Sequence, residues 1–241
     1  MHYQEIIRQI KKDLEKNKDL AYKKGSMSFF KEKIKPIGTR AKDTRKIANS
    51  YFQKIKHLPK LEIFSLCETL LETGFMELGS IALSFTFKLK KQFKKTDFKT
   101  FEKWLKKFVK NWAHCDDFCT HSVGYLICQY PELASELEKW TRSPNRWLRR
   151  AAAVSLIYPV RQKEKNQAVF LQKSLKIARL LLKDRDDLVQ KGYGWLLKEA
   201  ANHHQKQIFT FVLNKKAILP RTALRYAIEK MPEKLKRKAM E

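Results

Sequence analysis

Apolar residues recur at helical spacing along almost the whole chain. In residues 2–19, Ile6, Ile7, Ile10 and Leu14 form one stripe and lysines occupy the opposite side. This 3.6-residue period predicts amphipathic helices, and the two-residue alternation typical of strands is nearly absent. Only seven glycines and seven prolines interrupt the pattern. The sequence therefore predicts an all-α protein.

Helix limits follow from the prolines, the glycines and the ends of each apolar stripe. The pattern predicts helices over residues 2–19, 40–57, 59–73, 76–93, 97–111, 115–129, 131–141, 144–158, 164–184, 186–202, 204–215 and 220–230. Gly25 is expected to end the first helix, and residues 31–40 to form an extended connector because Pro36 disfavours helix before it. Ser143 before Pro144 is typical of a capped helix start. Residues 234–238, rich in lysine, are expected to be solvated and frayed.

The helices come in pairs, with about two for every 35 to 45 residues, a spacing typical of HEAT or armadillo repeats. Such repeats stack into a curved solenoid with a long concave face. We therefore predict a single helical-repeat domain over residues 1–241, in which the concave face is basic. An irregular helical bundle is the alternative.

The chain carries 52 Lys and Arg against 25 Asp and Glu, a formal net charge of +27. Self-repulsion of this size is relieved by a polyanion, so nucleic acid is the leading partner. A solvated basic surface or an anionic membrane surface remains possible on charge alone. The chain shows neither an apolar stretch long enough to span a bilayer nor a signal segment. We expect a soluble, cytoplasmic protein.

The cysteines do not form the pattern of a disulfide framework or of a zinc site. Cys115 and Cys119 lie four residues apart on one predicted helix, and we see no secretory signal within the sequence. With His114 and His121 they point in different directions around that helix, which cannot surround a tetrahedral ion. We expect free thiols, and neither a metal nor a cofactor.

One acidic and aromatic stretch stands out in this basic chain. Trp112 and Asp116 are four residues apart, so on a helix an indole face and a carboxylate share one side and can hold a cation. Asp117 is rotated about 100° away. The structural alternatives are an N-cap role for Asp116, at the start of a helix over 117–129, and core packing for Trp112.

Two later stretches add candidate contacts with an anion. Trp147 and Arg150 share a face at i, i+3, and Arg149 lies beside them on a helix whose N-terminus and guanidinium groups suit a phosphate. An ordinary basic helix surface is the alternative. Further on, Gly192 and Gly194 lie inside an apolar helical pattern and indicate close packing by a helix or a ligand, directly before Trp195.

These stretches resemble, in order, the signature segments of the AlkD-like DNA alkylation repair family. The matching segments are Asn111-Trp112-Ala113-His114-Cys115-Asp116, Trp147-Leu148-Arg149-Arg150-Ala151 and Gln190-Lys191-Gly192-Tyr193-Gly194-Trp195-Leu196-Leu197-Lys198-Glu199. Upstream, Pro36-Ile37-Gly38-Thr39-Arg40 and Arg45-Lys46-Ile47-Ala48 resemble the N-terminal motif of the family. The resemblance covers most of the chain.

The resemblance implies a monomeric DNA glycosylase of HEAT-like repeats that removes N3- or N7-alkylated purines from duplex DNA without drawing the base into a pocket. By position, Asp116 matches the catalytic aspartate, Trp112 and Trp195 the two aromatic residues at the lesion, and Arg150 the arginine that contacts the DNA backbone. Lys198 departs from the family, where arginine is more usual. A non-catalytic HEAT-like protein that binds branched or damaged nucleic acid remains the alternative.

Overall fold

The computed structural model describes residues 3–162 and 167–241, and within them every regular element is a helix. Two isolated bridges, Lys18 with Thr39 and Lys35 with Phe75, are the β-type pairings in that part of the chain. No helix there is long and apolar enough to cross a bilayer. The described chain divides into two compact units. A single domain over residues 1–241 stays a prediction.

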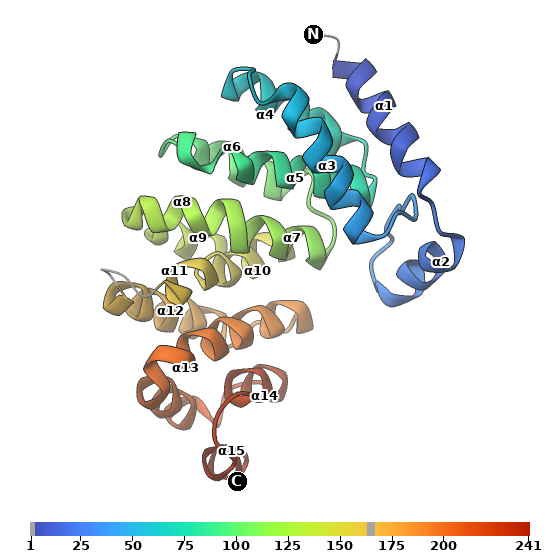
Figure 1. Ribbon diagram of the computed structural model, residues 1–241. Coiled ribbons are helices and arrows are strands. Elements are labelled where there is room, and N and C mark those ends of the chain that lie inside the picture. Colours follow the sequence, from blue (N-terminus) through green and yellow to red (C-terminus); the bar gives the residue numbers. More distant parts are fainter. Residues whose placement is uncertain (1–2, 163–166) are drawn as a thin grey trace. The chain divides into compact units, whose positions relative to one another are not determined.

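The first unit takes in the chain up to Lys94 together with Lys107–Asp117. Its helices are α1 (Tyr3–Lys16), α2 (Leu20–Phe29), α3 (Ala41–Ile55), α4 (Lys60–Glu72), α5 (Met76–Lys88), the short 3-10 helix η1 (Lys90–Gln92) and most of α7 (Trp112–Phe118). Within this unit α5 packs against both α3 and α4 (Figure 1). The core between them contains fully buried side chains such as Leu66, Leu70, Ile81 and Phe85.

The second unit contains Lys95–Lys106 and the chain from Phe118 onward. Its elements are α6 (Asp97–Lys107), the π-helical turn η2 (Cys119–Val123), α8 (Gly124–Gln129), the 3-10 helix η3 (Pro131–Ser135), α9 (Leu137–Trp140), α10 (Arg146–Val154), α11 (Ile157–Arg161), α12 (Gln167–Leu181), α13 (Asp187–Lys215), α14 (Arg221–Ile228) and α15 (Glu233–Met240). The long helix α13 packs against α10, α12 and α14 (Figure 1).

Aromatic side chains hold the beginning of the second unit together. Phe98 of α6 stacks on Trp140 with ring centroids 5.1 Å apart. Phe118 meets Phe101 edge-on at 5.1 Å, and all of these rings are buried. Offset and edge-on pairs of this kind add stability beyond the area that they bury. The stretch after α7 is therefore anchored on α6.

Several predicted helix limits were wrong. Gly25 lies inside α2, which begins after Asp19 because the Asp19 carboxylate accepts the Tyr22 backbone N–H. The helix predicted from Pro144 begins at Arg146, and the side chain of Asn145, not that of Ser143, caps it. Residues 233–240 are helical, with Ala239 buried, instead of frayed.

The predicted break between residues 202 and 204 is a kink. α13 runs from Asp187 to Lys215, and His204 has non-helical dihedral angles, φ −134° and ψ 42°. Residues 163–166, where the helix predicted over 164–184 would begin, lie outside the described residues. The expected connector over 31–40 contains no helix, as Pro36 requires.

Candidate active site

Helix α7 begins at Trp112, three residues earlier than predicted, because Asn111 caps it. The Asn111 side-chain oxygen accepts the His114 backbone N–H at 2.9 Å, which satisfies one of the free donors of the first turn. Trp112 and Asp116 are therefore one turn apart on the same helix, and both are half-buried. Asp116 lies within α7, so the alternative of an N-cap at Asp116 is wrong.

His114, which the sequence left unassigned, locks α7 to α5. Its Nε2 lies 2.9 Å from the Met76 carbonyl oxygen and its Nδ1 3.3 Å from the Asn111 amide nitrogen. Because a carbonyl only accepts, Nε2 carries the proton and Nδ1 accepts from Asn111. Burial lowers the pKa of His114 below its ordinary value of 6.5. A neutral histidine thus fixes the turn that carries Trp112 and Asp116.

Gly79 is the glycine that makes room for this histidine. A Cβ atom at position 79 would lie 2.5 Å from Cε1 of His114. The imidazole can approach the α5 backbone this closely only if residue 79 has no side chain. The contact between α5 and α7 therefore depends on a glycine–histidine pair that lies far apart in the sequence.

The Trp112 indole rests on aromatic residues from the end of α2. The Phe30 ring stacks on it with a centroid distance of 5.1 Å and an interplanar angle of 15°. Phe29 meets it edge-on at 5.9 Å, and Phe29 itself is 70% exposed. One face of the indole is thus covered by its own unit. Since Trp112 is half-buried, core packing accounts for only part of its surface.

A buried carboxylate fixes the connector between α2 and α3. Glu77, 6% exposed, accepts the backbone N–H groups of Ile37 at 2.8 Å, Gly38 at 2.7 Å and Thr39 at 3.2 Å. Gly38 has a φ of +113°, a backbone conformation that residues with a Cβ atom rarely adopt. The glycine of the N-terminal motif therefore shapes a loop whose donors converge on one acceptor.

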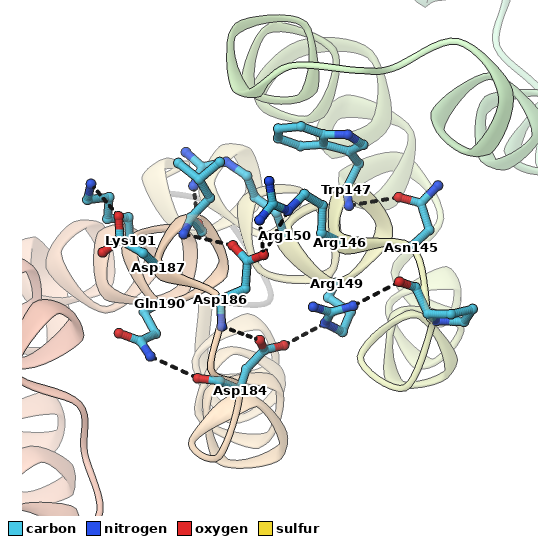
Figure 2. A network of polar contacts seen from close by, with 12 residues as sticks. Asn145, Arg146, Trp147, Arg149, Arg150, Asp184, Asp186, Asp187, Gln190 and Lys191 are labelled. Atoms are coloured by element: carbon cyan, nitrogen blue, oxygen red, sulfur yellow. Dashed lines mark hydrogen bonds and ion pairs between the residues drawn. The ribbon is translucent and has the colours of Figure 1, made fainter. Parts of the chain in front are cut away.

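The arginines at the start of α10 bind the segment that leads into α13 (Figure 2). Arg149 donates through Nε to Asp184 at 2.6 Å and through Nη1 to the Ser143 carbonyl at 3.0 Å. Arg146 pairs with Asp186, Nε to Oδ2 at 2.7 Å. The Arg149 guanidinium is thus committed to its own chain, and its predicted contact with DNA stays a prediction.

Arg150 is 5% exposed and donates through Nη1 to the Leu188 carbonyl at the start of α13 (Figure 2). A Cβ atom at Gly192 would lie 3.2 Å from Cγ of Arg150, so this glycine allows the arginine stem to pack on α13. Trp147, 6% exposed, is also part of the core beneath α10. Trp147 and Arg150, which were predicted to share a face, are thus both buried.

Trp195 lies on α13, half-buried, with its indole N–H directed at a buried carboxylate. Trp195 Nε1 donates to Glu199 Oε1 at 3.1 Å, one helical turn further on. A Cβ atom at Gly194 would lie 2.7 Å from Cβ of Tyr226, so this glycine serves the contact between α13 and α14. The close packing that the two glycines predicted is therefore with Arg150 and with a neighbouring helix.

The sequence reasoning missed three of the residues that organise these groups. Glu77 and His114 act through contacts 34 to 40 residues away in sequence, and nothing in the local pattern signals them. Glu199 had a visible signal, since it stands four residues after Trp195, where a helix brings the two side chains together.

The predicted site residues fall into two groups. Trp112 and Asp116 belong to the first unit, whereas Trp147, Arg149, Arg150 and Trp195 belong to the second. The four cysteines, all among the described residues, form no disulfide, and three of them are buried. Among residues 3–162 and 167–241, no group of three or more His, Cys, Asp or Glu side chains is arranged to hold a metal ion.

Residues 10–231 match the family model described as DNA alkylation repair enzyme, so the chain belongs to that family. The AlkD-like resemblance is thereby confirmed.

A solved structure has the same fold. It is described as "Predicted DNA alkylation repair enzyme from Enterococcus faecalis" and superimposes with a TM-score of 0.78 at 13% identity, over 90% of this chain and 98% of that one. The prediction of an all-α helical-repeat fold is confirmed. Among curated proteins, no significant sequence match is found.

Proposed function

We propose that this protein is a DNA glycosylase that hydrolyses the N-glycosidic bond of cationic N3- or N7-alkylated purines in duplex DNA. The observation that carries the proposal is helix α7, which presents the indole of Trp112 and the carboxylate of Asp116 one turn apart, at half-buried positions of a chain with net charge +27. Family membership supports a role on alkylated DNA.

The substrate is already activated by its positive charge, so the enzyme does not have to protonate the leaving base. When the bond between C1′ and the purine nitrogen breaks, its electrons neutralise the cationic ring, and the base leaves without protonation by a general acid. The sugar passes through an oxocarbenium-like state, which Asp116 stabilises as an anion. Asp116 also orients the water that adds to C1′, and the proton released from that water passes to the carboxylate or to solvent.

The tryptophans favour the charged base. The exposed part of the Trp112 ring offers a π-face to a cation, an interaction worth about 0.5–2 kcal/mol, and we expect the Trp195 indole to favour a cation in the same way. Lys and Arg side chains neutralise phosphates, so DNA affinity falls steeply with salt. The reaction requires no metal or cofactor, and we expect the protein to act as a monomer.

The test is the release of 7-methylguanine or 3-methyladenine from methylated duplex DNA. Asp116→Asn should lower the release rate about a hundredfold or more while DNA affinity is kept, because it removes only the charge that stabilises the sugar cation. Asp117→Asn is the matched control, since it removes the same charge one residue away and should retain release.

A wild-type protein that releases neither base refutes the proposal. If that protein also binds a DNA junction far more tightly than alkylated duplex, the non-catalytic alternative takes its place. Loss of release in Asp117→Asn but not in Asp116→Asn would move the catalytic role by one residue.

A further inference from the structure

Glu199 is a buried acid at the centre of a cluster of hydrogen-bond donors in the second unit. It is 5% exposed, and its two oxygens are divided between different partners. Oε1 accepts the indole N–H of Trp195 at 3.1 Å, and Oε2 accepts Nε of Arg161 at 3.0 Å. Lys230 and Asn202 approach the same carboxylate at 3.5 and 3.4 Å.

Arg161 contacts Trp195 as well as the acid. Its guanidinium carbon lies 5.7 Å from the centroid of the Trp195 ring, within the range of a cation–π contact. Glu199 therefore sets the orientation of the Trp195 indole in two ways. It binds the indole N–H directly, and it holds the Arg161 guanidinium over the ring. An arginine lying over one face leaves the opposite face as the one that a second cation can approach.

From these contacts we infer that Glu199 is a positioning residue for Trp195, and that it acts together with Arg161 to set which face of the indole meets a cationic purine. The inference rests on the proposed function, because it assigns Trp195 to the lesion. Glu199 itself touches neither the DNA base nor the sugar.

The charge state of Glu199 supports this role. Burial alone would raise the pKa of this carboxyl, but the hydrogen bond and charge of Arg161, the Trp195 N–H and the charge of Lys230 outweigh it and lower the pKa below its ordinary value. The group stays anionic at neutral pH. An anion hydrogen-bonded to the indole N–H also increases the negative character of the ring, which favours a cation.

Two substitutions at position 199 separate its contacts. In Glu199→Gln the amide oxygen can still accept the Trp195 N–H, whereas the amide NH2 group faces Arg161 and cannot bind it. In Glu199→Leu both contacts are lost. We expect base release at saturating DNA to fall in the order wild type, Glu199→Gln, Glu199→Leu, with roughly a tenfold or greater loss in the last, and DNA affinity to change little.

The second readout is the indole 1H–15N resonance of Trp195, assigned through Trp195→Phe, because it reports directly on the hydrogen bond from Nε1 to Glu199. We expect it to shift upfield in Glu199→Leu and to stay near its wild-type position in Glu199→Gln. Unfolding by urea is measured for both variants. If Glu199→Leu does not fold, base release and the Trp195 resonance in Glu199→Gln and Arg161→Ala test the inference instead.

Arg161→Ala and Lys230→Ala are a matched pair, since each removes one cation from the same carboxylate but only Arg161 covers the indole. Arg161→Ala should lower release several-fold. Lys230→Ala should keep it within about twofold of the wild type, because Lys230 is 51% exposed, lies 3.5 Å from the carboxylate and does not cover the indole. Equal losses in the two variants would overturn the assigned role of Arg161.

Release within about twofold of wild type in a folded Glu199→Leu protein overturns the inference. If the wild type releases no base, the proposed function fails, and the positioning role of Glu199 is then tested only by the Trp195 resonance of the DNA-free protein. In that case a Trp195 indole resonance that does not respond to Glu199→Leu or Arg161→Ala overturns the positioning role.

Discussion

Replacing Glu77 should destabilise the first unit, and the loss should grow with the number of its hydrogen bonds that the substitution removes. Oε1 accepts two backbone N–H groups, from Gly38 at 2.7 Å and Thr39 at 3.2 Å, and Oε2 accepts the third, from Ile37 at 2.8 Å. All three donors are buried. Glu77→Gln keeps the oxygen that serves two of them and turns an NH2 group toward the third, whereas Glu77→Leu leaves all three without an acceptor.

Each buried N–H left unpaired costs about 1–3 kcal/mol, and partial access of water lowers the sum. We expect the free energy of unfolding to fall by about 1–3 kcal/mol in Glu77→Gln and by about 3–5 kcal/mol in Glu77→Leu. The assay is urea unfolding followed by circular dichroism. Glu15→Gln is the control, because Glu15 is 54% exposed in a 3.8 Å ion pair and should change stability by less than about 0.5 kcal/mol.

A Glu77→Leu protein within about 1 kcal/mol of the wild type would refute this account, since it would mean that the loop donors find other acceptors or that their bonds contribute nothing net. Equal losses in the Gln and Leu variants would refute the division of donors between the two oxygens. In that case the negative charge, and not the number of acceptors, would be the stabilising property of Glu77.

Two further predictions concern the histidine that fixes α7. Because the pKa of His114 is lowered in the folded state, the unfolded chain binds a proton first as the pH falls below about 6.5. The free energy of unfolding should decrease from there by at most about 1.4 kcal/mol per pH unit, as urea unfolding between pH 8 and 5 would measure. The same decrease in a His114→Gln protein would contradict this prediction. Gly79→Ala should cost about 1–3 kcal/mol, since the new Cβ would lie 2.5 Å from the imidazole, and a double-mutant cycle with His114→Ala should recover part of that loss; strictly additive losses would show that the clash is not with His114.

The sequence predicted the helical architecture well because burial of one apolar stripe per helix is a local, periodic property. The sequence prediction failed where a single capping residue or a contact distant in sequence sets the limit of a helix. The sequence predicts a helix end at Gly25, but the Asp19 cap starts a new helix that runs through it. The helix start predicted at residue 115 is three residues late, because Asn111 caps a helix that begins at Trp112.

For the candidate site, helical spacing predicts Trp112 and Asp116 one turn apart on the same helix, as the structure has them. The same reasoning could not tell an arginine that is available to DNA from one committed to the fold. Arg149 and Arg150 share one helix turn with Trp147, yet the first binds Asp184 and the second the Leu188 carbonyl. These contacts span 35 to 38 residues, so only tertiary structure reveals them.

Acidic residues are the scarce component of this chain, 25 against 52 basic ones, and three of them that are largely covered by protein share a property. Glu77 gathers the donors of the connector before α3, Asp184 holds the Arg149 guanidinium, and Glu199 holds Arg161 and the Trp195 indole. A buried anion is costly unless several donors meet it, and each of these has them. These acids therefore orient the cations, backbone donors and aromatic ring around them. Asp116 is half-buried, whereas Glu77 and Glu199 are buried, and the contact that we propose between Asp116 and a sugar cation requires such an accessible carboxylate.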